Sequence, residues 1–474
     1  MSAAITSQRP SRTKGAKPVS RWIAAAMAVA IACPPLPASA QGRGGGLPLI
    51  RDAEIEQLLR EYTQPIFKTA GLSGANIRIV LINDKSFNAF VVDGRRIFVN
   101  TGALMESTTP NQIIGVLAHE TGHIAGGHLS RIRDELARLQ TQALIGMLLG
   151  AAAMAAGGGS NGASQAGVAM ITGSQQFATR SLLSYQRAHE EQADRAAVKF
   201  LTATGQSAKG MYETFKRFAD QSMFTARYAD PYAQSHPMPT ERVAALTEIA
   251  RSSPNWEKKD PPELQARHDM MRAKLYGFME PPQTIARRYP LSDTSLPARY
   301  ARAISTYRYS DLRAAIAQID ALIAAQPNNP YFYELKGQAL LEGSRANEAI
   351  APLRQAVRLA PQPTLIQLML GQALVATDNP AYADEAITIL RNALAREPDA
   401  PQAYQQLAMA YGRKGDVAQA DLASAQAAFS RGDIKTAREL AARAKTRLQV
   451  GSPGWVRADD IVATKLPQVP SRPN

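Results

Sequence analysis

Hydrophobic and polar residues follow different patterns in two long regions of this 474-residue chain. In the first, from residue 47 to 250, short strand-like runs precede long segments in which apolar residues recur at helical spacing. Residues 77–82, 87–92 and 95–100 predict three strands, and Asp93-Gly94 predicts the turn between the last two. We therefore expect an α+β domain that is mainly helical and holds a small β-sheet.

The second region, residues 297–448, has the period of tetratricopeptide repeats, in which small residues recur at spacings of 12, 7 and 5 positions and end near a proline. Small residues there let paired helices approach closely, and each pair buries its apolar face by stacking on the next. The pattern predicts an all-α solenoid with a concave, protein-binding surface. The positions are Ala303, Ala315, Leu322 and Pro327; Gly337, Ala349, Ala356 and Pro361; Gly371, Ala386, Ala393 and Pro398, with an insertion near residues 378–383; Ala408, Ala420 and Ala427; and an overlapping Ala425, Ala437 and Ala444.

Residues outside these regions predict a signal peptide, a connector and a tail. Residues 1–40 contain five cations, an apolar stretch at 22–32 and a small-residue cleavage site ending at Ala40. We expect cleavage after Ala40, secretion to the periplasm and a fall in net charge from +14 to +9. Residues 251–296 are rich in proline and predict a connector with one helix, and residues 449–474 predict an irregular tail.

The only cysteine, Cys33, lies within this signal. Lipoprotein cleavage at Cys33 is an alternative, although Ala30 stands where leucine is usual and Pro34 follows. With either cleavage the mature chain would have no disulfide framework. Its stability would therefore not depend on disulfides in an oxidising compartment.

A further apolar stretch, residues 143–156, is followed by a run of three glycines. It is short for a bilayer span, which favours a buried or interfacial helix. With residues 166–172 as the returning segment, residues 143–175 could form a helical pair in peripheral contact with a membrane. The alternative is a glycine-rich hairpin without that contact.

The candidate chemistry begins with the segment His119-Glu120-Thr121-Gly122-His123. Histidines at positions i and i+4 lie on one face of a helix and can bind the same Zn²⁺, with Glu120 as the general base. Thr109 as N-cap, Pro110 as the first helical residue and Gln112 at the capping-box spacing predict the start of this helix. Gly126-Gly127 predicts its end.

A third ligand is needed, and Glu190 is the best candidate. His128 misses the position of the third histidine in metzincins by one residue. Glu190 and Asp194 are also i and i+4, so one helical face offers a carboxylate for the metal and a second one to hold a ligating imidazole by its other N–H. We include Asp194 in the catalytic site for that reason. The alternative is a solvated acidic face.

The combination of HETGH with a later E-x-x-A-D resembles the gluzincin peptidases that include the HtpX and CAAX prenyl proteases. It resembles most closely their soluble periplasmic branch, the β-barrel assembly-enhancing protease type. The resemblance covers residues 48–250 and continues through the repeats to about residue 448. It implies that His119, His123 and Glu190 bind one zinc ion, that Glu120 is the catalytic base, and that outer-membrane β-barrel proteins are the substrate class. Further matching stretches are residues 50–56, 88–90, 97–102 and 235–237.

His236 lies in a proline-rich stretch that predicts a loop, and three roles are consistent with its sequence context. It could be an additional zinc ligand that holds the enzyme in a low-activity state, a residue that binds substrate or stabilises the transition state, or an ordinary loop histidine. The match of its His-Pro segment to the family favours a place in the site. We expect no site role for His128, which can support the end of the helix, or for His268 in the connector.

Two classes of function are consistent with these features. The first is a periplasmic zinc endopeptidase that removes misfolded or stalled outer-membrane proteins, with substrate pairing to an exposed strand edge at residues 88–90. An ordinary hairpin is the alternative for that edge. The second is a tetratricopeptide-repeat chaperone or assembly factor with latent proteolysis, which docks outer-membrane proteins or their assembly machinery. The net charge is positive, but the sequence contains no nucleic-acid-binding motif, so we expect no nucleic-acid partner.

Overall fold

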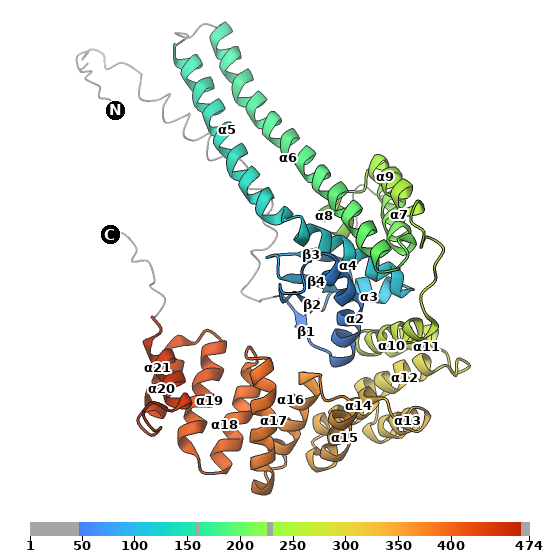
Figure 1. Cartoon of the computed structure of the whole chain (residues 1–474), viewed down its shortest axis with the longest axis vertical. Coiled ribbons are helices and arrows are strands. Elements are labelled where there is room, and N and C mark those ends of the chain that lie inside the picture. Colours follow the sequence, from blue (N-terminus) through green and yellow to red (C-terminus); the bar gives the residue numbers. More distant parts are fainter. Residues whose placement is uncertain (1–46, 157–160, 225–230, 466–474) are drawn as a thin grey trace, which may run out of the picture. The chain divides into compact units, whose positions relative to one another are not determined.

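The computed structural model describes residues 47–156, 161–224 and 231–465 (Figure 1). The predicted signal peptide, Cys33 and the cleavage site at Ala40 lie outside these residues. The sheet has four strands, β1 (Leu49–Ile50), β2 (Arg78–Ile82), β3 (Ala89–Val91) and β4 (Arg96–Asn100), in the order β1-β2-β4-β3.

The three predicted strands are present, and the structure adds the short β1. Strands β3 and β4 form the expected antiparallel hairpin, with Gly94 at a φ of 72° in the turn. Strands β2 and β4 are parallel, and β3 is an edge strand.

Helix α4 (Pro110–Ala125) lies at the centre of the first domain and packs on α2 (Ala53–Thr69), β3, β4 and α7 (Lys209–Phe224). It is buried along almost its whole length because its apolar residues, among them Ile113, Val116 and Leu117, point in several directions. The short helix α3 (Thr101–Glu106) connects β4 to the turn before α4.

The predicted capping box of α4 does not form. Thr109 is the N-cap, but its side chain makes no capping hydrogen bond. Gln112 Oε1 instead accepts the backbone N–H of Thr108 at 2.7 Å, one residue before the cap. The connector supplies a carboxylate, since Asp260 Oδ2 accepts the N–H of Asn111 at 2.9 Å. Tertiary contact thus satisfies a donor that the local pattern assigned to the helix itself.

Helices α5 (His128–Ala156) and α6 (Asn161–Ala203) form a long antiparallel hairpin (Figure 1). The predicted helical pair at residues 143–175 is the outer part of this hairpin, although its glycine-serine turn at 157–160 lies outside the described residues. Within the described part of the chain, no helix is both long and apolar enough to cross a bilayer.

Helices α8 (Pro231–Ser235) and α9 (Thr240–Arg251) follow α7, and residues 236–239 connect the two. The connector then forms two helices, α10 (Pro262–Met279) and α11 (Pro282–Arg288), where the sequence predicted one. The pair Pro281-Pro282 explains the difference: proline cannot continue α10, but it fits the first turn of α11.

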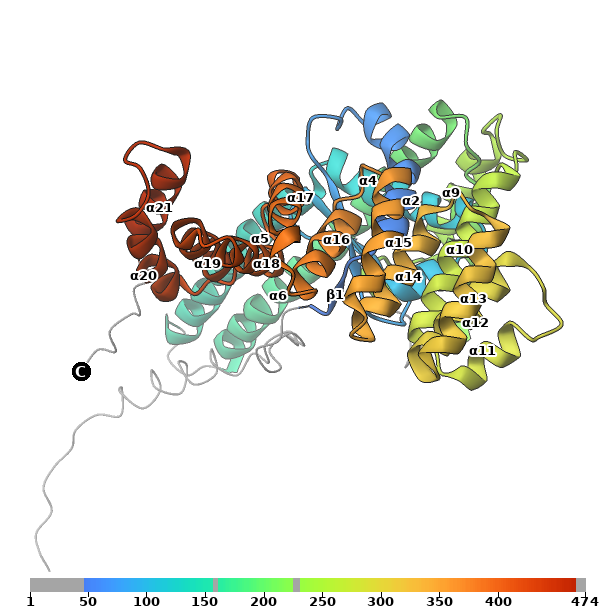
Figure 2. The ribbon, with the colours of Figure 1, turned by 90° about the horizontal axis from the view of Figure 1, so that it is seen from below.

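The repeat region is a series of stacked helices from α12 (Leu296–Tyr309) onward (Figure 2). Gly371 confirms the reason for small residues at the repeat positions, because a Cβ there would lie 2.6 Å from the Leu390 side chain. The insertion predicted near 378–383 is the 3₁₀ turn η1 (Pro380–Tyr382). The other helices are α13 (Leu312–Ala325), α14 (Pro330–Glu342), α15 (Ala346–Leu359), α16 (Thr364–Ala376), α17 (Ala383–Arg396), α18 (Pro401–Arg413), α19 (Val417–Ser430) and α20 (Ile434–Lys445).

The prediction of an irregular tail at 449–474 is wrong for its first part. Helix α21 (Pro453–Ala463) begins at a Ser452 cap that accepts the N–H of Trp455, and Pro453 is its first residue. Proline starts this helix rather than excluding it. Ala458 and Ile461 are buried against the preceding repeat helices, which gives α21 the position of a terminal cap.

Candidate metal centre

Two helices that cross closely carry most of the site. His119 and His123 are on α4, and Glu190 and Asp194 are on α6. Gly122 lies at the contact, where a Cβ atom would be 2.8 Å from the carbonyl oxygen of Ala193. The glycine therefore lets α6 approach the histidine face of α4.

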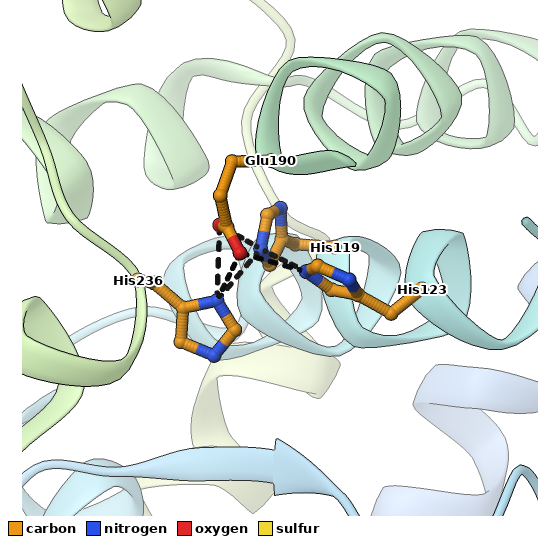
Figure 3. Close-up of side chains that lie close together, drawn as sticks. All are labelled: His119, His123, Glu190 and His236. Atoms are coloured by element: carbon orange, nitrogen blue, oxygen red, sulfur yellow. Dashed lines mark hydrogen bonds and ion pairs between the residues drawn. The ribbon is translucent and has the colours of Figure 1, made fainter. Parts of the chain in front are cut away.

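The structure brings His119, His123, Glu190 and His236 together, with one possible ligand atom from each within 4.8 Å of the others (Figure 3). Nε2 of His119 is 3.0 Å from Nε2 of His123 and 3.3 Å from Oε2 of Glu190. Oε1 of Glu190 is 3.4 Å from Nε2 of His123. Figure 3 shows the carboxylate reaching toward both rings from α6.

The other nitrogen of each ring faces a different group. Nδ1 of His119 is 2.9 Å from Oδ1 of Asp194, and Nδ1 of His123 is 3.1 Å from Nδ1 of His128. If each ring donates its N–H from Nδ1, both Nε2 lone pairs point at the same place. Two imidazoles and a carboxylate that converge in this way form a donor set suited to a divalent cation such as Zn²⁺.

The electrostatics of this cluster favour a positive charge at His119, whereas burial lowers the pKa of His123 to about 3. Burial lowers the pKa of His119, but the carboxylates of Asp194 and Glu190 outweigh burial and raise it to about 9. Burial raises the pKa of Glu190, yet His236, His119 and His123 hold it well below its ordinary value. A cation bound between the rings would take the place of the proton that this environment attracts.

Asp194, which the sequence placed behind a ligand, is held by an arginine that the sequence did not single out. Arg242 on α9 donates from Nε and Nη2 to the two oxygens of Asp194, at 2.7 and 2.8 Å. Its Nη1 is 2.9 Å from Oε2 of Glu190 and also donates to the carbonyl oxygen of Pro237 at 2.9 Å. One buried guanidinium thus orients both carboxylates and the segment that carries His236.

Glu120 follows His119 on α4 and is 1% exposed. Burial raises the pKa of its carboxyl. Its Oε1 has no hydrogen-bond partner among the described residues and lies 3.5 Å from Nε2 of His236. A buried carboxylate oxygen with a free lone pair beside a convergent donor set has room to accept a proton from a water molecule there.

His236 follows α8 and enters the cluster from the side opposite His123 (Figure 3). Its Nδ1 is 3.0 Å from Oε2 of Glu190 and 3.3 Å from Nε2 of His119. Its ring packs on that of Tyr232, with centroids 4.7 Å apart. The structure therefore places His236 inside the site rather than in a solvated loop.

His128, for which the sequence predicted no site role, contacts a member of the cluster. It is 2% exposed, stacks on His189 and reaches Nδ1 of His123. Burial lowers the pKa of its imidazole to about 4. His268 is buried elsewhere, where it contacts the hydroxyl of Tyr62 and the carbonyl oxygen of Ser107.

Comparison with known proteins agrees with this geometry. Residues 50–250 match Peptidase family M48, and residues 300–362 match the tetratricopeptide repeat. The "Beta-barrel assembly-enhancing protease" of Yersinia pestis is 26% identical over 421 residues, which cover 87% of this chain and 83% of that protein. The protein of the same name from Escherichia coli is 25% identical over 424 residues, which cover 88% and 84%.

These matches confirm the resemblance seen in the sequence. The chain has a metalloprotease domain followed by tetratricopeptide repeats, and it is similar to beta-barrel assembly-enhancing proteases over most of its length.

Proposed function

We propose that this chain is a zinc endopeptidase in which His119, His123 and Glu190 hold one zinc ion. The observation that carries the proposal is the convergence of two Nε2 atoms and one carboxylate, with distances of 3.0 to 3.4 Å between the atoms. A zinc ion in such a site supplies a Lewis acid that polarises a peptide carbonyl and lowers the pKa of water to about 7.

The residues of the chain would do the remaining work. Glu120 accepts the proton of the attacking water through its unpaired Oε1 and then delivers it to the leaving amine. The carboxylate of Asp194 lies 2.9 Å from Nδ1 of His119 and would support that ring through its charge, and Arg242 holds Asp194. Burial of Glu120 keeps its carboxylate away from bulk water, which would otherwise compete for the proton.

The direct test is Glu120→Gln, which keeps the shape of the side chain and removes its basicity. We expect zinc content to stay as in the wild type and chelator-sensitive cleavage of casein to fall at least about 100-fold. Cleavage at the wild-type rate by a zinc-loaded variant would contradict the assignment of Glu120.

We propose outer-membrane β-barrel proteins in assembly as the substrate class, on the basis of the names of the relatives. Strand β3 supports a way to bind them, since it is an edge strand and packs on α4, the helix of the histidines. An extended segment of a stalled barrel could pair with this edge through main-chain hydrogen bonds. Binding of such a peptide should weaken when Val91, a partly exposed residue of β3, is replaced by proline, while zinc content stays the same.

The repeat region supports a second activity, the docking of protein partners without cleavage. A tetratricopeptide array presents a concave surface, and it spans most of the chain after α11. If the protein is also a chaperone or assembly factor, Glu120→Gln should bind an unfolded outer-membrane protein as tightly as the wild type. Loss of this binding together with loss of catalysis would favour the protease function alone.

Periplasmic location is part of the proposal, and its support is the amino-terminal pattern of cations, apolar residues and a small-residue site. N-terminal sequencing of the secreted protein should begin at Gln41. An uncleaved protein that is found in the cytoplasm and still has its first forty residues would contradict the proposed periplasmic location. We also propose functional limits of 47–250 for the protease domain, 251–296 for the connector and 297–448 for the repeats.

We propose peripheral membrane contact for the outer part of the α5–α6 hairpin. Leu144, Ile145, Leu148 and Leu149 on α5 are each more than half exposed. No Asp, Glu, Lys, Arg or His occurs between Arg138 and Arg180, although a fifth of the whole chain is charged. An exposed apolar row in a segment without charge, bounded by arginines, suits the boundary between lipid tails and headgroups.

Flotation with vesicles of phosphatidylethanolamine and phosphatidylglycerol tests this contact. We expect the wild type to float, and the double variant Leu148→Asp, Leu149→Asp to stay with the soluble fraction. The control is Leu291→Asp, because Leu291 is 86% exposed and lies outside the hairpin. Equal flotation of all three proteins, or of none, would contradict membrane contact through this surface.

A further inference from the structure

The two histidines of α4 have different groups behind them. Nδ1 of His119 faces the carboxylate of Asp194. Arg242 holds this carboxylate in place. Nδ1 of His123 faces a neutral type of acceptor instead, the imidazole of His128, at 3.1 Å. The planes of these two rings are nearly perpendicular, at 85°. A nitrogen of one ring can therefore receive the N–H of the other.

The fold places His128 for this contact in three ways. Gly127, at a φ of 61°, follows the C-cap of α4 and turns the chain so that His128 begins α5. The ring of His128 stacks on that of His189 at 4.3 Å with an interplanar angle of 12°. Gly126 leaves the space that the ring needs, because a Cβ at this position would collide with Nε2 of His128.

The contact with His128 fixes the position of the proton on His123. If Nδ1 of His128 accepts the N–H of His123, Nδ1 of His123 carries the only proton of that ring. Nε2 of His123 is then left unprotonated and points at Nε2 of His119 and at Glu190. Helix α6 thus carries a proposed ligand, Glu190, and also His189, whose ring stacks on that of His128.

We infer that His128 is a positioning residue for the metal centre, which holds His123 in the tautomer and orientation that binding of the cation requires. The inference rests on the proposed zinc site. It assigns to His128 the task that Asp194 has for His119, but with an uncharged acceptor. Removal of such a supporting group typically weakens metal binding by about 10- to 100-fold.

Two substitutions of His128 separate its hydrogen bond from its bulk. His128→Leu fills a similar volume without an acceptor, whereas His128→Asn can place an amide oxygen where Nδ1 lies. The readout is zinc affinity of the purified mature chain, measured by competition with a chromogenic chelator. We expect roughly 10- to 100-fold weaker binding for His128→Leu and a change of no more than about threefold for His128→Asn.

Gly126→Ala is a second, independent variant in case His128→Leu does not fold. It leaves His128 in the sequence but displaces its ring. We expect a loss of zinc affinity in the same range as for His128→Leu. Unfolding temperatures of the metal-free proteins, compared by circular dichroism, identify which variants are folded.

Wild-type affinity in the folded His128→Leu or Gly126→Ala protein would overturn the inference. So would equal loss in the leucine and asparagine variants, since packing against His189 would then explain both. A wild-type protein that binds no zinc would contradict the proposed function itself. That result is distinguishable from a zinc-binding wild type whose variants do not differ from it.

Discussion

At the scale of single side chains, the distances from His236 to its neighbours bear on whether it binds the metal. Its Nδ1 lies 3.0 Å from Glu190 and 3.3 Å from His119, as a fourth ligand would. Four protein ligands complete a tetrahedral zinc site and leave no position for water. If His236 were such a ligand, the site would be closed, and opening would require His236 to move.

We expect His236→Ala to keep its zinc and to cleave casein several-fold faster than the wild type, because the population with an open position increases. Zinc content by atomic absorption and the chelator-sensitive cleavage rate test this. A slower variant with normal zinc content would instead assign His236 to substrate or transition-state binding. An unchanged rate and zinc content would remove it from the site.

Sequence patterns identified the residues of the site that have a fixed spacing along a helix. His119 and His123, and likewise Glu190 and Asp194, are four residues apart on one helix, so their proximity was predictable. Arg242 and His128 were missed for a physical reason. Arg242 meets Asp194 only because α9 packs on α6, and His128 meets His123 only because of the turn at Gly127. Only His128 has a local signal in the sequence, which is its short distance along the chain from the end of α4.

At the scale of helices, the contact between α4 and α6 depends on Gly122. A Cβ there would be 2.8 Å from a backbone oxygen of α6, which cannot move as a side chain could. We expect Gly122→Ala to lower the free energy of unfolding by about 1–3 kcal/mol and to weaken zinc binding. Urea unfolding followed by circular dichroism measures the first effect.

Gly412→Ala is the matched control, since Gly412 is near the end of α18 and a Cβ there meets no atom within 4 Å. Alanine at that position should be neutral or stabilise by about 0.5–1 kcal/mol. If Gly122→Ala proved as stable and as tight for zinc as Gly412→Ala, the close approach of α4 and α6 would not govern the site.

Element types were more predictable than element ends. Apolar periodicity predicted α4, and short strand-like runs predicted β2, β3 and β4. The start of α4 was incompletely predicted because Asp260, far away in the sequence, supplies one of its caps. The prolines at α11 and α21 suggested a break in helical structure, but each of them begins a helix. The sequence therefore did not predict these two helices.

At the scale of the whole molecule, a buried cluster of charges joins the protease domain, the connector and the first repeats. Nζ of Lys274 on α10 lies 2.8 Å from Asp52, 3.2 Å from Glu54 and 3.8 Å from Glu334 of α14. Tyr300 of α12 donates to Glu54 at 3.0 Å. Lys274 must satisfy several carboxylates at once, and Glu334 has the most distant contact.

Burial raises the pKa of Glu334 from 4.5 to about 8. Because the folded pKa is the higher one, the protonated carboxyl stabilises the fold fully below pH 4.5, and this stabilisation is lost as pH rises toward 8. We expect Glu334→Gln to be more stable than the wild type at pH 8, by on the order of 1–3 kcal/mol, and similar to it at pH 5. Urea unfolding at the two pH values is the measurement.

Lys274→Met is the contrasting variant, because it leaves Glu54 buried without its cation. It should destabilise the protein by about 3–5 kcal/mol at neutral pH. A Glu334→Gln protein that loses stability at pH 8 would show that this carboxylate is ionised and needed by Lys274.

The repeat array was predicted well because its signal is redundant: small residues return in the same register through successive helix pairs, and Gly371 and Leu390 show the contact that selects them. The joining cluster was not predicted, because its charges come from α2, α10, α12 and α14 and no spacing along the chain relates them.

The proposed activity requires one cation held by side chains from two distant helices, and metal analysis of the purified mature protein tests this most directly. Atomic absorption should find one zinc ion per wild-type chain, and Glu190→Gln should retain much less after dialysis against a weak chelator. Asp220→Asn, at a half-exposed position on α7, is the control and should retain zinc as the wild type does. A wild type without zinc, or a Glu190→Gln protein with a full complement, would contradict the account.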